Sequence, residues 1–334
     1  MEQIKRTHTC GDLRKSDDGK TVILNGWVHR IREHGGITFI NLRDRYGITQ
    51  VVVDSDATSS LLDTAKALRM EFCIAVEGIV RARPDSMINK DMTTGEIELV
   101  AKDIEILSKS DVLPFMIDEV QKDGTPVIPN EDLRLKYRYL DLRTSKMQHN
   151  IILRSKVAFA TREYLTEQGF LEIETPTFIK STPEGARDYL VPSRVHPGTF
   201  YSLPQSPQLY KQILMVSGFD KYFQIARCYR DEDARGDRQP EFTQIDMELS
   251  FTNREEVLSV TEGMMQHIFK KTLNYDLPAK FDRLSWTEAF DLYGSDKPDL
   301  RFDLKIQDAA FMADLSDFVA FKAGAANADP TLPR

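Results

Sequence analysis

The chain has 334 residues, of which 41% are hydrophobic, and this length and composition allow two domains with hydrophobic cores. Its net charge of -8 argues against a general nucleic-acid coat protein, because nonspecific binding depends on neutralising phosphates with lysine and arginine. The polar start, the lack of a membrane-spanning apolar run and three scattered cysteines predict a cytoplasmic, globular protein with no anchor, disulfide framework or zinc site.

The first 108 residues predict a small β-barrel. Runs of strand-forming residues are separated by turns at Gly35-Gly36 and Tyr46-Gly47, and Ser59–Leu68 has helical spacing. Five short strands with a helix after the third are typical of an OB-fold. The expected strands are Val22–Ile31, Ile37–Asp44, Ile48–Asp54, Phe72–Arg83 and Glu96–Leu107.

Such barrels bind single-stranded nucleic acid across strands two and three, through basic side chains and exposed aromatic rings. The corresponding residues here include Arg32, Phe39 and Gln50. On pattern alone, Phe39 fits a core aromatic better than a platform for a base. His34, taken by itself, is a solvated loop histidine.

Asp111–Glu131 contains three prolines and no sustained periodicity, which predicts a linker or hinge covering residues 109–131. The basic segment Arg134–Arg143 follows and opens a second domain; it could contact phosphates or be a solvated helix start. Asn150–Gln168 and Arg254–Leu273 have apolar stripes at helical spacing. The first predicted helix is followed by a short strand that ends at Pro176.

Two strands joined by a charged loop are predicted between Tyr222 and Phe251. From Phe242 onward residues alternate, so that Phe242, Gln244, Asp246 and Glu248 share one face while Ile245, Met247 and Leu249 share the core face. An arginine at the end of the first strand could bind nucleotide phosphates, and an aromatic ring could stack on a purine. A solvated hairpin with a charged outer face explains the alternation equally simply.

The string RCYRDEDARGDRQPEFTQIDME, beginning at Arg227, resembles motif 2 of the class II aminoacyl-tRNA synthetases, in detail that of the bacterial-type aspartyl enzymes. The resemblance implies an ATP site with Arg230 as the catalytic residue, which holds the α-phosphate and the aspartate carboxylate. Glu232 would read the adenine amino group and Phe242 would stack beneath the ring. Asp231 and Gln239 would also lie in the ATP site.

The same resemblance implies an L-aspartate pocket. STPEGARDYLVPSR, from Ser181, is similar to the family's loop that closes over the amino acid, and LPQSPQLYKQ, from Leu203, is similar to its aspartate-binding segment. Without the family, Lys211 would be an ordinary surface lysine; within it, a cation suits the substrate's side-chain carboxylate. The implied aspartate-binding residues are Glu184, Ser206, Gln208, Lys211, Arg230, Gln244 and Asp246.

For the barrel, the resemblance implies anticodon binding by Arg32, Phe39 and Gln50, with Phe39 stacking on a base. His34 falls where relatives that select tRNA-Asp differ from those that also accept tRNA-Asn, and histidine resembles the relaxed type. The helix and strand before Pro176 resemble motif 1, which implies a homodimer. The expected fold is α+β and multidomain: an OB-fold, then an incomplete class II catalytic domain with an antiparallel sheet.

No stretch resembles motif 3, which in the family carries an arginine for the γ-phosphate and acidic residues for Mg²⁺. We therefore expect an N-terminal portion, with domains at 1–108, 132–290 and the start of an inserted domain at 291–334, that does not adenylate aspartate efficiently alone. The expected function is an aspartate–tRNA ligase using ATP and Mg²⁺, with tRNA-Asp and also tRNA-Asn as partners. The alternatives are an asparaginyl enzyme, which Lys211 argues against, and a nonenzymatic tRNA-binding module.

Overall fold

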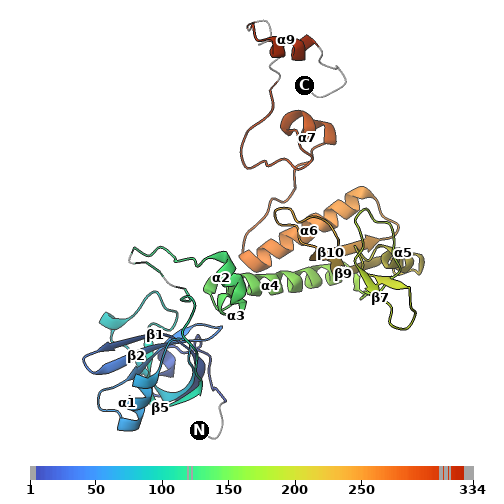
Figure 1. Cartoon of the computed structure of the whole chain (residues 1–334). Helices are drawn as coiled ribbons and strands as arrows, with labels where there is room; N and C mark the ends of the chain where they lie inside the picture. Colours follow the sequence, from blue (N-terminus) through green and yellow to red (C-terminus); the bar gives the residue numbers. More distant parts are fainter. Residues whose placement is uncertain are drawn as a thin grey trace. The chain divides into compact units, whose positions relative to one another are not determined.

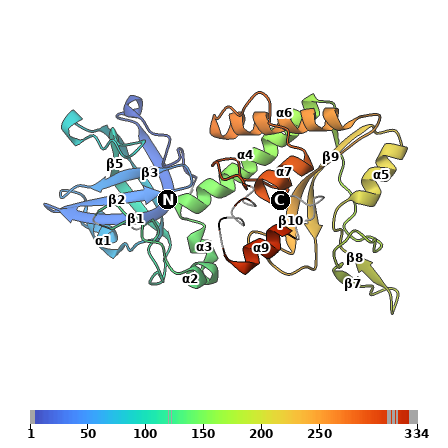
Figure 2. The same ribbon diagram turned by 90° about the horizontal axis from the view of Figure 1, so that it is seen from above.

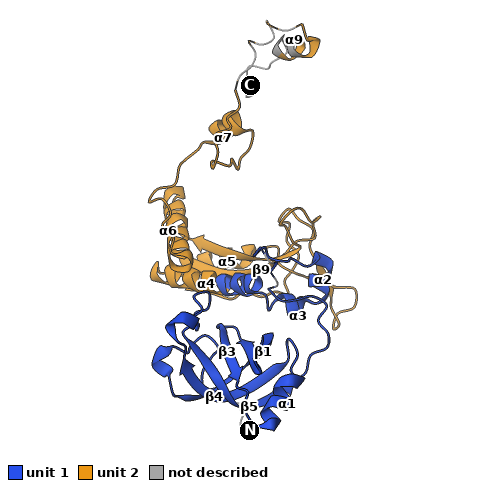
Figure 3. Cartoon of the chain, turned by 90° about the vertical axis from the view of Figure 1, so that its left-hand side faces the viewer, with its two compact units in different colours: residues 1–154 blue, residues 155–334 orange. Residues whose placement is uncertain are grey.

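The computed structural model describes residues 5–118, 120–121, 123–307, 311, 315 and 317–326. The chain divides into two compact units, residues 1–154 and 155–334, which Figure 3 colours separately. Part of the expected inserted domain at 291–334 lies outside the described residues. Among the residues that the structure describes, no helix has both the length and the apolar character needed to cross a membrane.

The first unit contains a closed five-stranded barrel, drawn in blue to cyan in Figure 1, with strand order β1-β2-β3-β5-β4. Apolar side chains at alternate strand positions fill it, including Leu24, Ile40 and Leu99. The helix α1 follows the third strand, so the predicted OB-fold is confirmed. The elements are β1 Thr21–His34, β2 Ile37–Arg43, β3 Ile48–Val53, α1 Ser59–Ala67, β4 Cys73–Ala82 and β5 Ile97–Ser108.

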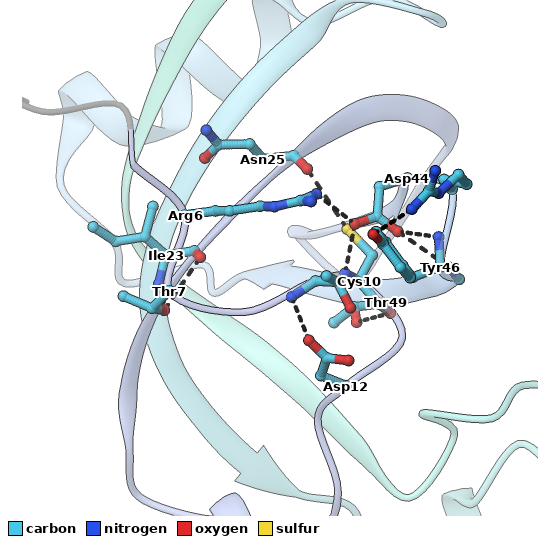
Figure 4. Close-up of polar contacts among 12 residues, drawn as sticks. Arg6, Thr7, Cys10, Asp12, Ile23, Asn25, Asp44, Tyr46 and Thr49 are labelled. Carbon is cyan, nitrogen blue, oxygen red and sulfur yellow. Dashed lines mark hydrogen bonds and ion pairs between the residues drawn. The ribbon is translucent and has the colours of Figure 1, made fainter.

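The Asp44 carboxylate, buried at the end of β2, organises the β2–β3 turn (Figure 4). Its Oδ1 accepts hydrogen bonds from the backbone N–H groups of Tyr46 and Gly47, at 2.7 and 3.1 Å. Its Oδ2 accepts from the Cys10 N–H and from Arg6, both at 3.0 Å. One side chain therefore closes the turn and holds the N-terminal segment against the barrel.

The segment predicted as a linker contributes a small core of its own. Phe115 and Ile117 are buried with Leu140 of α3 (Arg138–Asp141), and Leu133 of α2 (Glu131–Lys136) packs against them. Asp141 is buried and accepts a hydrogen bond from Arg134 at 2.8 Å and another from Arg138. These two arginines therefore stabilise the α2–α3 turn. The sequence had suggested a phosphate contact or a solvated helix start for this segment, and neither expectation included this role.

Helix α4 (Ser145–Glu167) starts five residues before the predicted Asn150. The Ser145 N–H donates to both oxygens of Asp118, at 3.1 and 3.0 Å, which satisfies an N–H group that has no partner within the helix. Asp118 lies 27 residues earlier in the chain. A local sequence pattern could not show a cap supplied from that distance.

The second unit is built on a three-stranded sheet of order β10-β9-β6. Helices α4 and α6 run side by side over one face of it (Figures 1 and 2), with Leu165, Phe223 and Met264 in the shared core. Helix α6 has the predicted bounds, and the Asn253 side chain accepts the Glu256 N–H at its start. The elements are β6 Leu171–Glu172, β9 Lys221–Tyr229, β10 Glu241–Leu249 and α6 Arg254–Leu273.

The other elements of this unit are shorter. Strands β7 (Leu190–Pro192) and β8 (Phe200–Ser202) form a hairpin, and α5 (Gln208–Val216) packs on the β9–β10 pair. Beyond α6, the helix α7 (Trp286–Tyr293) begins with a capping box made by Ser285 and Glu288. The helix α9 covers Val319–Ala326.

Candidate functional site

The β9–β10 hairpin separates functional groups from core side chains as its alternation predicts. The strands are antiparallel, with Phe242 opposite Cys228 and Asp246 opposite Gln224. Met247 and Leu249 pack against the core under α4 and α6, so the alternating side chains of Phe242, Gln244 and Asp246 lie on the other face. Ile245, also predicted for the core face, is 37% exposed and lies outside that cluster, so the prediction is wrong for this residue.

The loop between the two strands encloses a hollow of about 350 Å³. Arg230, Glu232, Gln239 and Phe242, all predicted for the ATP site, line it together. The Arg230 guanidinium stands over the Phe242 ring, 5.0 Å from its centroid. A purine stacked on that face of the ring would displace the guanidinium, which would then be free to reach a phosphate.

Asp231, the remaining residue predicted for the ATP site, lies at the junction with the loop after β6. Its N–H donates to the Arg187 carbonyl at 3.0 Å, and the two side chains approach to 3.9 Å. A second hollow of about 440 Å³ is lined by both residues and shares Glu232 and Arg238 with the first. The loop predicted to close over the amino acid is therefore already paired with the ATP loop.

Lys211 of α5 points at the functional face of β10. Its Nζ donates to Asp246 Oδ1 at 2.8 Å and lies 3.4 Å from Glu248 Oε2. Only 11% of the Lys211 side chain is exposed. Burial lowers the pKa of Lys211, but the hydrogen bond and charge of Asp246, with Glu248, raise it more, so the net direction is upward. An ammonium with three donors can hold both carboxylates and still donate to a bound ligand.

Glu184 and Ser206 come together as predicted for one pocket: the Ser206 hydroxyl donates to Glu184 Oε2 at 2.7 Å. Gln208 is the first residue of α5, one turn before Lys211. Gln244 Oε1 lies 3.3 Å from the Cys228 sulfur, and burial raises the pKa of the Cys228 thiol to about 11. Cys228 is thus a neutral donor at this position.

Gln205, which the sequence did not single out, supports the loop that carries Glu184. It is buried, and its side chain accepts from the Ala186 N–H at 3.0 Å and donates to the Ala186 carbonyl at 2.9 Å and to Asp188. These bonds hold the loop that carries Glu184. A single glutamine has no periodic signal; its position in the LPQSPQ stretch beside Ser206 was the only indication.

The three residues predicted for anticodon binding share the outer face of the barrel. Arg32 lies opposite Phe39, and Gln50 lies opposite Asn41, two residues further along β2. Phe39 is half-buried and is absent from the barrel core, whereas its neighbour Ile40 is fully buried in that core. Arg32 Nη2 reaches Gln50 Oε1 at 3.5 Å.

A β-bulge places Arg32 on this face. The β1–β2 register shifts between Val28 and Arg30, so the intervening residue, His29, is extra and the later residues of β1 change sides. Glu98 of β5 joins the same face, since it accepts from Gln50 at 3.2 Å and pairs with Arg81 and Arg83. Glu98, Arg81 and Arg83 were not singled out from the sequence. His34 is exposed at the end of β1, before two glycines with positive φ.

Magnesium prefers carboxylate oxygens, and Glu232, Asp233 and Asp237 line the first hollow. Within the part of the chain that the structure describes, however, no three His, Cys, Asp or Glu side chains are grouped closely enough to hold a metal ion. We therefore assign no magnesium ligand to these residues.

The fold combines a closed five-stranded barrel with a second unit in which two hollows adjoin the β9–β10 hairpin. Residues 22–107 match the family described as "OB-fold nucleic acid binding domain", and residues 130–323 match "tRNA synthetases class II (D, K and N)". The second match covers more than half of the chain. The chain belongs to the class II tRNA synthetases of this group.

Relatives named as aspartate–tRNA ligases match nearly the whole chain. The chain is 71% identical to the aspartate–tRNA(Asp/Asn) ligase of Treponema denticola, covering 96% of this chain and 54% of the relative. It is 56% identical to the aspartate–tRNA ligase of Fervidobacterium nodosum, covering 95% and 52%. The crystal structure of asparaginyl-tRNA synthetase from Pyrococcus horikoshii with asparaginyl-adenylate matches with a TM-score of 0.70 at 25% identity, covering 81% and 59%. The chain thus spans about half the length of the curated relatives it matches.

Proposed function

We propose that this chain is part of an aspartate–tRNA ligase, which activates L-aspartate with ATP to aspartyl-adenylate and transfers the aspartyl group to tRNA. The observation that carries the proposal is the arrangement around β10. The predicted ATP residues Arg230 and Phe242 lie at one end of the strand, and the buried Lys211–Asp246 pair lies further along the same face.

The catalytic contribution of these residues is positioning and charge stabilisation. Arg230 would bind the α-phosphate and the substrate carboxylate, where a guanidinium can follow the charge that develops at phosphorus. Phe242 would hold the adenine ring, and Glu232 would accept a hydrogen bond from its amino group. Mg²⁺, when bound with ATP, would neutralise phosphate charge.

Lys211 would select the aspartate side chain. A carboxylate offers the remaining N–H of the buried ammonium a charged acceptor, whereas the side chain of asparagine offers only a neutral carbonyl oxygen. Glu184 would bind the substrate ammonium, and its bond to Ser206 would orient it. Gln208, Gln244 and Asp246 would complete the pocket.

On the barrel, we assign Arg32, Phe39 and Gln50 to the anticodon and His34 to tolerance of tRNA-Asn. The relatives support both possibilities for tRNA choice, because one is named for tRNA(Asp/Asn) and another for tRNA without that qualification. Charging of purified tRNA-Asn distinguishes them: the relaxed assignment requires aspartylation of both tRNAs, and aspartylation of tRNA-Asp alone contradicts it. The three unpaired cysteines agree with a cytoplasmic site of action.

The test is aspartate-dependent ATP–pyrophosphate exchange, measured for these 334 residues and for a protein of the relatives' full length. We expect exchange in the longer protein, dependent on aspartate and not supported by asparagine. Arg230→Ala should reduce it by about 100-fold or more, as for removal of one charge-stabilising donor. Exchange that asparagine supports equally would favour the asparaginyl alternative.

A nonenzymatic tRNA-binding module remains the second candidate, because the barrel by itself accounts for RNA binding. Such a module has no use for an ATP half-site. ATP binding to this chain, measured by calorimetry and lost in Arg230→Ala, would contradict it; tRNA binding without ATP binding or exchange in the longer protein would establish it.

A further inference from the structure

Glu71, between α1 and β4, carries two features that mark a constrained position. It is 4% exposed, and its backbone has a φ of 62°, in the left-handed region that glycine favours. Its N–H donates to the Val28 carbonyl at 2.7 Å, directly beside the bulge at His29. An acidic side chain is therefore held inside the protein by a strained backbone at the point where β1 changes face.

Two arginines from different segments share the Glu71 carboxylate. Arg43, at the end of β2, binds it with both terminal nitrogens at 3.0 Å and also reaches His29 Nδ1 at 2.9 Å. Arg143, just after α3, donates to Oε2 at 2.8 Å and lies 4.8 Å from the centroid of the Trp27 ring. The Glu71 carboxylate therefore links two places in the chain. One is the bulge in β1, which turns Arg32 to the outer face, and the other is Arg143, two residues before α4.

We propose that Glu71 and Arg143 form a positioning latch, which ties the RNA-binding barrel to the start of α4 and is required for efficient tRNA charging. The inference rests on the proposed function. Helix α4 begins at Ser145 in the first unit and continues to Glu167 in the second, so the latch acts on the element that connects them. The Glu71 carboxylate binds Arg43 of the barrel and Arg143 of the segment that leads into α4.

The latch differs from ion pairs that only stabilise the barrel. Arg6 binds the buried Asp44 at 3.0 Å and is 39% exposed, much as Arg143 binds the buried Glu71 at 2.8 Å and is 27% exposed. Loss of either arginine leaves its carboxylate with other partners: Arg43 for Glu71, and three backbone N–H groups for Asp44. Arg6→Ala and Arg143→Ala are therefore matched variants, one within the barrel and one between the barrel and α4.

The experiment uses the protein at its relatives' full length. We expect Arg143→Ala to lower kcat/KM for tRNA aspartylation by about tenfold, the scale of coupling between distant sites. Aspartate-dependent ATP–pyrophosphate exchange and affinity for an isolated anticodon stem-loop RNA should stay within about twofold, because neither requires the barrel to be tied to α4. Arg143→Lys keeps the positive charge but loses the flat guanidinium over Trp27, so its kcat/KM for tRNA aspartylation should lie between those of the unaltered protein and Arg143→Ala.

Backbone hydrogen exchange provides a readout that does not depend on activity. The start of α4, residues 145–150, should exchange faster in Arg143→Ala and at the unaltered rate in Arg6→Ala. Three results would each overturn the latch. The first is an equal loss of charging in the two variants, and the second is a loss of stem-loop binding in Arg143→Ala as large as its loss of charging. The third is unchanged charging together with unchanged hydrogen exchange at α4 in Arg143→Ala. An unaltered protein that fails to charge tRNA would instead contradict the proposed function, and the exchange measurement at α4 would still test the latch.

Discussion

Lys211 illustrates how one residue can serve binding and stability together. Its ammonium is buried against Asp246 and Glu248 of a neighbouring strand, and a buried ion pair broken on one side leaves an uncompensated charge. The same ammonium is the cation proposed for the substrate carboxylate. Loss of Lys211 should therefore weaken aspartate binding and lower the stability of the fold for different reasons. A second substitution can distinguish the two effects.

We expect Lys211→Met to lower the free energy of unfolding by about 3 kcal/mol, because Asp246 loses its buried partner. In a protein of full length, the KM for aspartate in ATP–pyrophosphate exchange should rise by about 100-fold or more. Adding Asp246→Asn should recover part of the stability and none of the aspartate use. Recovery of both would show that Lys211 acts on the substrate only through the fold.

His29 makes the stability of the barrel depend on pH. Burial, with the neighbouring Arg43 charge, lowers the pKa of His29 below its usual 6.5. The folded protein therefore keeps this histidine neutral while the unfolded chain takes up a proton below pH 6.5, so stability is present above that pH and is lost as the pH falls towards the folded pKa.

Denaturation should therefore show a larger drop in the free energy of unfolding between pH 7.5 and 5.5 for the unaltered chain than for His29→Gln, which can still accept from Arg43 but does not titrate. The fluorescence of Trp27 reports the barrel once Trp286→Phe has removed the other tryptophan. His149→Gln, an exposed histidine in the same unit, is the control. An equal pH dependence in all three proteins would contradict the role of His29.

At the scale of elements, the contact between α4 and α6 depends on a glycine. A Cβ at Gly263 of α6 would overlap the Tyr164 hydroxyl of α4 and lie 2.9 Å from Cζ of that ring. Nearby, His267 and Lys271 of α6 pair with Glu163 of α4, at 2.7 and 3.2 Å. The two helices are therefore held at a separation that leaves no room for a methyl group.

Gly263→Ala should destabilise the second unit by about 1–3 kcal/mol, despite the higher helix propensity of alanine, because overpacking forces the helices apart. Combining it with Tyr164→Phe removes the overlapping oxygen and should return part of the loss, measured by thermal unfolding. An alanine variant more stable than the starting protein would show that propensity outweighs packing here.

The elements that sequence patterns predicted are those whose signals are local. Alternation defined the barrel strands and the β9–β10 hairpin, and α6 has its expected bounds. The contacts that sequence reasoning missed join distant positions: Asp118 at the start of α4, Glu71 between two arginines, and Gln205 under the Glu184 loop. Each is a single polar residue that periodicity does not distinguish.

At the scale of the molecule, apolar side chains remain exposed on α4 and on the segment after it. Phe159 is 70% exposed, Leu171 52% and Phe178 60%. Exposed large apolar groups are common at interaction surfaces, and this segment corresponds to the one expected to form a homodimer. We propose a second copy of the chain as the partner that covers them.

Phe159→Asp should convert a dimer into a monomer in light scattering at micromolar concentration, since a charge buried without a partner opposes association. Phe251→Asp is the matched control, because Phe251 is 98% exposed in the turn after β10 and outside the proposed interface. Dissociation by both variants, or by neither, would contradict a dimer through α4.

Strand β10 also limits how proteins built on this plan can change in length. Its side chains alternate between the face shared with Lys211 and the core beneath α6. One residue inserted between Phe242 and Asp246 would exchange the two faces beyond the insertion, sending Asp246 into the core and Met247 into the pocket. Insertions and deletions among homologues should therefore fall in the loop at 230–240, where hairpin length can vary while the strand register is kept.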